Sequence, residues 1–316
     1  MGHPYLYTRA DDLWVITCFF NPCDYASRRN NYNQFRRPLD EAGINSLTVE
    51  CVFGEQESAL KEYENVVTLR GSQLNMMWQK ERLLNLALER LPGHVRKVAW
   101  IDSDVLFENP DWAALTSRSL DEYTVVQPFQ QLVHLSPGRL VPDDDAEAIE
   151  SFASVYSSDA GACRWSHFGV HGHTGMAWAA RAEVLRRHGL FQVQLSGGAD
   201  HFMAHAVTGS FESPCFTQAR FTPLYKEFRE WAKHFYADVG GRLGFVEGRC
   251  LHLWHGVREA RRYNSVLREM LSLDFRPGRD VFVGENGLLT WSGRNMPLQR
   301  WAEQYFWDRS EDLLPQ

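Results

Sequence analysis

The sequence predicts an α/β fold with an open, mostly parallel sheet that carries helices on its faces. The chain has 316 residues, of which 44% are hydrophobic, enough to bury the core of one large domain. Strand-like and helix-like segments follow one another in the order β-α-β-β-α-β over residues 13–107. This alternation is typical of α/β domains, in which ligands collect at the carboxyl ends of the strands.

Each element follows from a local pattern. Short apolar, β-rich runs predict strands at 13–20, 46–54, 65–70 and 97–101. Apolar residues at helical spacing predict helices at 28–42, 76–91, 199–207, 260–273 and 297–307. Residues 136–150 are interpreted as a polar, acidic loop. Residues 173–191 are interpreted as a small-residue turn leading into a helix, and residues 249–256 as a late strand ending in histidines.

Composition restricts the class of protein. The formal net charge of −7 argues against a protein that simply coats nucleic acid. The six cysteines are scattered without a CxxC pair, which predicts neither a zinc framework nor a disulfide scaffold and fits a reducing cytoplasm. The first residues lack the pattern of a signal peptide, and no apolar run approaches the about 20 residues that span a bilayer. We therefore expect a cytoplasmic protein without a membrane partner.

A pair of aspartates follows the predicted strand at 97–101. Asp102 and Asp104, with Ser103 between them, stand where that strand ends. Two carboxylates one residue apart can share a hard divalent cation, which in turn can bridge a diphosphate. The alternative is an acidic loop that caps the next helix. The position at the carboxyl edge of a sheet favours the metal site.

Two histidines three residues apart end the late strand. His252 and His255 can complete a metal site begun by the two aspartates. Taken alone, the pair is better explained by one core and one surface histidine.

A Gly-Gly turn precedes the helix at 199–207. Gly197 and Gly198 permit close backbone approach to a ligand. Asp200 then begins the helix, either as its N-cap or as a general base that takes the proton of an acceptor hydroxyl.

Together these motifs resemble GT-A glycosyltransferases, above all the β-1,4-galactosyltransferase-like and polypeptide GalNAc-transferase-like branches. The resemblance runs in order over about residues 13–260: FFNPCDYASRRNNYNQF after the first strand, WQKERLLNLALER before the Asp-Ser-Asp motif, then HTGMAWAARAEVLRRHGLF, GGAD and HLWH. It implies a Rossmann-like catalytic domain at 1–260 with a helical, Arg- and Trp-rich C-terminal extension at 261–316. The chain departs from the pattern at Ala199, where a glutamate is usual, and it lacks the WGWG run. The acceptors of these families are therefore not assigned to this chain.

The resemblance also implies roles for individual residues. Asp104, His252 and His255 would hold Mn²⁺ or Mg²⁺ against the donor diphosphate, with Asp102 near the ribose or the metal. Asp200 would act as the base of an inverting displacement. The expected donor is UDP-glucose or a similar nucleotide sugar. Arg28, Arg29 and Lys80 are further candidates for the donor, with a surface position as the alternative for each, and Ser103 is another. The candidates for the acceptor are His173, Thr174, Gly175, Gly198 and Trp178, with a core position as the alternative for Trp178.

A second group of histidines, His167, His171 and His173, is interpreted as a loop on the acceptor side. We prefer this to a separate zinc site because no cysteine or carboxylate lies at ligand spacing in the sequence.

The acceptor stays open between a surface polymer, a small molecule, a protein and a hydroxymethylated pyrimidine in DNA. The pattern of FNP, SRR and N near the start, MWQKERLLN, and a late HLWHG is similar to that of bacterial and phage glycosyltransferases associated with base-modifying oxygenases. This group includes base J glucosyltransferases. Arginines beyond the catalytic core could track the phosphates of DNA: 258, 261, 262, 268, 276 and 279. Two other classes remain as alternatives, a metal-dependent hydrolase and an inactive nucleotide-sugar-binding module.

Overall fold

The computed structural model of the chain describes residues 3–165, 169–263 and 265–314. Its main sheet has the strand order β10-β6-β9-β4-β1-β2-β3. These strands are β1 (Leu13–Phe20), β2 (Ser46–Phe53), β3 (Val66–Gly71), β4 (Lys97–Ile101), β6 (Val125–Gln127), β9 (Ala177–Arg181) and β10 (Leu243–Phe245). Only β9 runs against the others. The predicted α/β fold with a mixed, mostly parallel sheet is confirmed.

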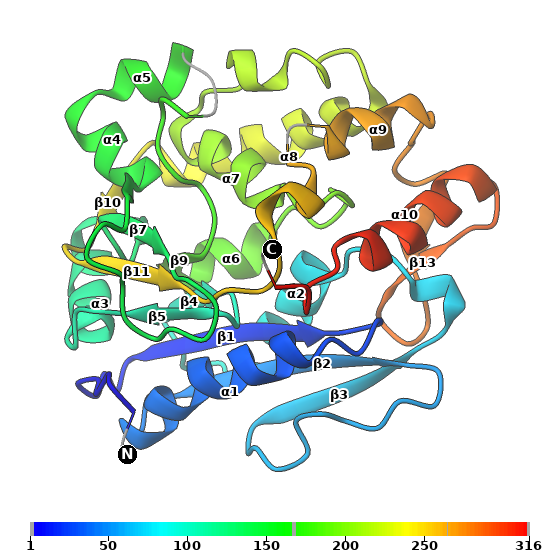
Figure 1. Ribbon diagram of the computed structural model, residues 1–316. Coiled ribbons are helices and arrows are strands. Elements are labelled where there is room, and N and C mark those ends of the chain that lie inside the picture. The colour runs from blue at the N-terminus through cyan, green and yellow to red at the C-terminus, as the bar shows by residue number, and fades with distance from the viewer. Residues whose placement is uncertain (1–2, 166–168, 264, 315–316) are drawn as a thin grey trace.

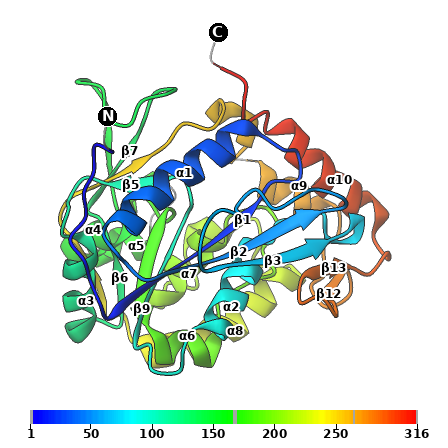
Figure 2. The same ribbon diagram turned by 90° about the horizontal axis from the view of Figure 1, so that it is seen from below.

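Helices cover both faces of this sheet (Figures 1 and 2). Side chains alternate along β1, so that Leu13 and Val15 pack toward one helix layer and Ile16 toward the other. One layer holds α1 (Ala26–Glu41) and α3 (Trp112–Glu122). The other holds α2 (Lys80–Arg90), α6 (Ala182–His188), α7 (Ala199–Thr208) and α8 (Pro223–Val239). The two hydrophobic layers bury the sheet and leave the carboxyl ends of its strands to carry polar groups.

A second sheet of four strands lies beside the first. Its order is β5-β11-β7-β8, formed by β5 (Val105–Phe107), β7 (Gln131–His134), β8 (Ala148–Glu150) and β11 (Arg249–His252). The segment 136–150 was expected to be a loop, but its last residues form β8 and pair with β7. Two short helices follow β8, α4 (Phe152–Ser158) and α5 (Ala160–Trp165).

β9 lies in a segment that the sequence pattern assigned to a turn before a helix. Its residues, Ala177–Arg181, are mostly alanines with high intrinsic helix propensity. They pair with β4 on one side and β6 on the other, and their small side chains are fully buried between the two helix layers. Cross-strand pairing and burial therefore override local propensity, and the helix begins only at Ala182.

The C-terminal part contains the two predicted helices, α9 (Val266–Ser272) and α10 (Met296–Asp308). Between them a hairpin of β12 (Val281–Val283) and β13 (Leu289–Trp291) was not foreseen. The main-chain carbonyl of Leu289 accepts hydrogen bonds from Asn75 and Gln79 at 3.0 and 2.8 Å, so this part packs on the start of α2. The predicted division into domains at residue 260 stays a prediction. In the described part of the chain, no helix is both long enough and apolar enough to cross a bilayer.

Gly172 shapes the loop that carries His171 and His173. Its φ is +77°, and a Cβ there would lie 2.6 Å from the carbonyl oxygen of Ser151. We expect Gly172→Ala to lower the free energy of unfolding by about 2–4 kcal/mol, from the left-handed backbone and the clash together. Urea denaturation measures this. Gly138→Ala is the matched control, because Gly138 has φ +72° but no atom within 4 Å of the added Cβ. Equal losses in the two variants would show that the contact with Ser151 contributes nothing.

Candidate functional site

A cavity of about 750 Å³ opens beyond the carboxyl ends of β1 and β4 and beside the end of β11. Twelve of the fourteen candidate residues line it: Arg28, Lys80, Asp102, Ser103, Asp104, His173, Thr174, Gly175, Gly198, Asp200, His252 and His255. They come from segments far apart in the sequence, and the sheet edge brings them together.

Asp104, His252 and His255 form one compact group of possible metal ligands. One ligand atom from each lies within 4.8 Å of the others. The Nε2 atoms of the two histidines are 2.7 Å apart, and the Nε2 of His255 is 3.3 Å from an Asp104 carboxylate oxygen. Asp102 forms an ion pair with Lys80 instead. Of the four predicted ligands, three lie together in this group, and all four stay a prediction as ligands.

Strand pairing produces this group. β5 follows directly after Asp104 and pairs antiparallel with β11, so that Val105 lies opposite His252. The amide of Leu253 donates a hydrogen bond to the Asp104 carbonyl at 2.8 Å. The chain then turns after β11, and His255 faces back to the same point.

A third histidine, His134, orients His252. β7 pairs parallel with β11, which places His134 opposite His252. The Nδ1 atoms of these two rings are 2.9 Å apart. With a metal ion bound, His252 would keep its proton on Nδ1, donate it to His134 and offer its Nε2 lone pair to the ion, the arrangement that supports a histidine ligand in metal sites.

The group fits a divalent cation. The second Asp104 oxygen, Oδ1, and the Nδ1 of His255 are buried and have no hydrogen-bond partner among the described residues. Although burial alone would raise it, a hydrogen bond with His252 and the charges of Arg28 and Arg261 lower the pKa of Asp104 to about 2. A carboxylate with two imidazoles is a donor set suited to Mn²⁺ and related ions.

Lys80 links the other two carboxylates of the cavity. It is the first residue of α2, and its Nζ lies 2.6 Å from oxygens of both Asp102 and Asp200. Burial would lower the pKa of Lys80, but the two carboxylates and Glu81 raise it well above its usual value. Burial also raises the pKa of Asp102 to about 6, and the neighbouring ammonium limits that rise. The lysine therefore stays charged and binds both aspartates.

Asp200 is not a helix cap. The N-cap of α7 is Gly198, and the Asp200 carboxylate lies in the first helical turn, where it pairs with Lys80. Its side chain lines the cavity. Of the two roles that the sequence left open, the structure removes capping.

The C-terminal segment supports the histidine pair. Glu311 is fully buried, with its carboxylate 2.6 Å from Nε of Arg309 and 3.2 Å from Nη1 of Arg28. Its oxygen is also 3.9 Å from Nδ1 of His255. Arg261 donates a hydrogen bond to the His255 carbonyl at 2.7 Å. Residues beyond 260 thus form one wall of the site.

The other two of the fourteen candidate residues lie elsewhere, and one histidine of the second group is not described. Trp178 is 1% exposed, stacks on Trp100 and donates a hydrogen bond to the Thr174 carbonyl at 2.8 Å, so it occupies the core position rather than an acceptor platform. Arg29 does not line the cavity and forms a surface ion pair with Asp24. His167 lies outside the described residues.

The arginines expected to track DNA phosphates are largely engaged with acids. Arg261 is buried near Glu311. The others with described ion pairs are Arg262 with Glu269 and Asp308, Arg276 with Asp274, and Arg279 with Asp274 and Asp280. Paired guanidinium groups supply little free charge for a phosphate backbone. The side chain of Arg258 lies outside the description.

Several cavity residues have no local sequence signal. His134, Tyr305 and Arg309 line it. None belongs to a motif with regular spacing, and each reaches the cavity only through tertiary packing. The lone signal available was the density of arginine and tryptophan after residue 250, which does not single out a residue.

No protein-family model and no curated protein matches the sequence. Among solved structures, the chain is similar to glucosyl-3-phosphoglycerate synthase from Mycobacterium tuberculosis in complex with Mg²⁺ and UDP. The TM-score is 0.42 at 13% identity, over 86% of this chain and 82% of that one. The same enzyme in complex with Mn²⁺, UDP-glucose and phosphoglyceric acid gives 0.40 at 14% identity, over 89% and 87%.

The catalytic domain of Drosophila β1,4-galactosyltransferase 7, in complex with xylobiose, gives a TM-score of 0.32 at 11% identity, over 64% of this chain and 62% of that one. The ligands in these complexes belong to those proteins, and at TM-scores below 0.5 they assign nothing to this chain.

Proposed function

We propose that the protein is a metal-dependent glycosyltransferase that moves a sugar from a nucleoside diphosphate sugar, with a uridine diphosphate sugar as the expected donor, to an acceptor hydroxyl. One observation supports this above the others. A carboxylate and two histidines suited to a divalent cation share a cavity with a second carboxylate, Asp200, that can serve as a base. The cavity volume, about 750 Å³, suits a ligand of nucleotide-sugar size.

Asp104, His252 and His255 would hold Mn²⁺ or Mg²⁺. When bound, the ion supplies positive charge that stabilises the diphosphate as it leaves. Lys80 and Arg28 line the same cavity and would contact the phosphates, although the pairing of Lys80 with Asp102 and Asp200 and of Arg28 with Glu311 offsets part of their charge.

Asp200 would take the proton of the acceptor hydroxyl. The hydroxyl oxygen then forms a bond to the anomeric carbon while the bond from that carbon to the diphosphate oxygen breaks. The nucleoside diphosphate leaves with the electron pair, and the proton stays on Asp200. A single displacement of this kind inverts the anomeric centre. Lys80, within 2.6 Å of the Asp200 oxygen, holds the carboxylate in place in the cavity.

The test is donor binding by calorimetry over a panel of UDP-, GDP- and dTDP-sugars, with Mn²⁺ or Mg²⁺ present and with EDTA. We expect one donor to bind in a metal-dependent manner. Asp104→Asn keeps the shape of the side chain but removes its charge. We expect it to weaken metal-dependent donor binding by at least about 10–100-fold, the loss typical when only a partner of a metal ligand is changed. Asp144→Asn is the control, because Asp144 is exposed.

Two results would count against the proposal. Failure of wild-type protein to bind any donor in the panel would remove the nucleotide-sugar site. Release of free sugar or phosphate at a rate that no acceptor increases, under conditions in which Asp104→Asn is inactive, would favour the metal-dependent hydrolase.

A further inference from the structure

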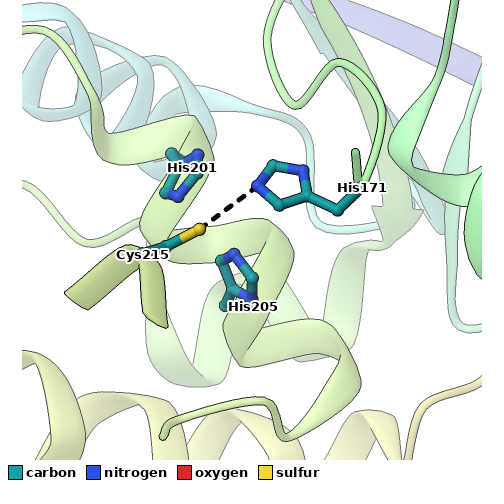
Figure 3. A group of neighbouring side chains, drawn as sticks. All are labelled: His171, His201, His205 and Cys215. Carbon is teal, nitrogen blue, oxygen red and sulfur yellow. Dashed lines mark hydrogen bonds between the residues drawn. The ribbon is translucent and has the colours of Figure 1, made fainter. Parts of the chain in front are cut away.

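A second group of possible metal ligands lies apart from Asp104, His252 and His255. Figure 3 shows His171, His201, His205 and Cys215 pointing toward one another. One ligand atom from each lies within 4.8 Å of the others. Cys215 Sγ lies 3.3 Å from His171 Nε2. The two groups share no residue.

Three segments supply these side chains. His201 and His205 are four residues apart on α7 and therefore share one face of that helix. His171 comes from the loop before β9, and Cys215 from the short 3₁₀ turn Pro214–Phe216. A metal bound by all four would tie the first turn of α7 to two loops.

The orientation of His171 suits a ligand. Its Nδ1 is 2.9 Å from the carbonyl oxygen of Gly172. This carbonyl can only accept, so the ring carries its proton on Nδ1 and turns its Nε2 lone pair toward Cys215. A backbone carbonyl that holds one ring nitrogen while the other binds metal is the usual support of a histidine ligand.

His205 is costly to bury without a ligand. Its side chain is fully buried, and neither of its ring nitrogens has a hydrogen-bond partner among the described residues. The rings of Phe152 and Phe216 lie 5.5 and 5.1 Å from it, centroid to centroid. A polar ring left without a hydrogen bond in the protein interior is destabilising. A metal ion would give one of its nitrogens a partner.

We propose that His171, His201, His205 and Cys215 form a closed, four-coordinate site that binds Zn²⁺. Imidazole nitrogens and cysteine thiolates are zinc ligands, and structural zinc sites are almost always four-coordinate and tetrahedral. Tetrahedral Zn²⁺ with the usual bond lengths places its ligand atoms about 3.3–3.6 Å apart. The 3.3 Å contact already has this separation, and an outer limit of 4.8 Å leaves only small side-chain movements to complete the geometry.

The site would position the carboxylate that faces the cavity. Asp200 immediately precedes His201, so fixing His201 fixes the first turn of α7. His201 and Cys215 also line the cavity. With all four positions taken by protein, the ion has no place for substrate or water. The four residues are therefore positioning residues, and zinc binding does not depend on the proposed sugar transfer.

The experiment measures metal in the full-length protein without any nucleotide sugar. To exclude zinc held by Asp104, His252 and His255, the comparison is made in the Asp104→Asn background. After reconstitution with Zn²⁺ and removal of excess, we expect one equivalent of zinc there by mass spectrometry of the metal. Cys215→Ser and His205→Gln should reduce this to below about a tenth of an equivalent. Cys23→Ser is the matched cysteine control, since Cys23 lies away from the group and is half-buried. Asp104→Asn should retain the zinc.

Cobalt gives a readout that a merely structural effect of substitution would not produce. The Co²⁺-substituted wild type should show the intense visible absorption of a tetrahedral ion together with thiolate-to-cobalt charge transfer. Cys23→Ser should keep the charge-transfer band, and Cys215→Ser should lose it.

Three outcomes would overturn the proposal. One is a folded wild type that takes up neither Zn²⁺ nor Co²⁺. Another is zinc content unchanged in both Cys215→Ser and His205→Gln. The third is loss of zinc in Asp104→Asn alone. If the two variants do not fold, the cobalt spectrum of wild type decides the question by the presence or absence of thiolate charge transfer. Absence of donor binding with zinc retained would defeat only the proposed function.

Discussion

We expect Asp200→Asn to lower the rate of sugar transfer by about 10²–10⁴-fold, the contribution of a positioned general base. Asparagine has nearly the same shape but cannot take the acceptor proton. The metal group does not include Asp200, so metal-dependent donor binding should persist. The measurement is steady-state transfer to the acceptor once it is identified, with donor affinity measured separately.

Glu183→Gln serves as the control for this variant. Glu183 also stands in the first turn of a helix, α6, but is exposed. It should leave transfer unchanged. Transfer by Asp200→Asn within a few-fold of wild type would show that another group is the base, even if donor binding requires Asp104.

The second large effect concerns stability. Glu311→Gln should lower the free energy of unfolding by about 3–5 kcal/mol at pH 7, as expected when one partner of a buried charge network is removed. The amide keeps the side chain's volume but leaves Arg309, Arg28 and Arg261 without their common buried countercharge. Urea denaturation of both proteins measures the difference. Glu285→Gln, at an exposed position, should change it by less than about 0.5 kcal/mol.

The same carboxylate predicts a pH dependence. Burial alone would raise its pKa, but Arg28, Arg309 and Arg261 lower the pKa of Glu311 from 4.5 to about 2. A depressed pKa in the folded state stabilises the fold above the unfolded value and loses that effect as the pH falls. The stability difference between wild type and Glu311→Gln should therefore be constant above about pH 5 and shrink between pH 4.5 and 2. A difference that does not change over this range would show that the charge of Glu311 is not what stabilises the fold.

Local patterns in the sequence were sufficient for most of the main sheet and its first helices. The run 13–20 coincides with β1, and the helix at 28–42 differs from α1 by one or two residues at each end. These elements have strong apolar periodicity and lie in the hydrophobic layers. β9 was missed because pairing on both sides, which no local pattern reveals, decided its conformation.

For the candidate site, too, some features followed from the sequence and others only from the tertiary structure. The sequence by itself determined an α/β fold and placed Asp102, Asp104 and the histidines at strand ends, because hydrophobic periodicity and strand termination are local properties. Only the tertiary structure decided that Asp102 pairs with Lys80 while Asp104 joins His252 and His255. It alone brought Cys215 to His171, 44 residues away along the chain, where spacing in the sequence had argued against a zinc site. Ligand groups and ion pairs depend on distances in space, and packing between distant segments sets those distances.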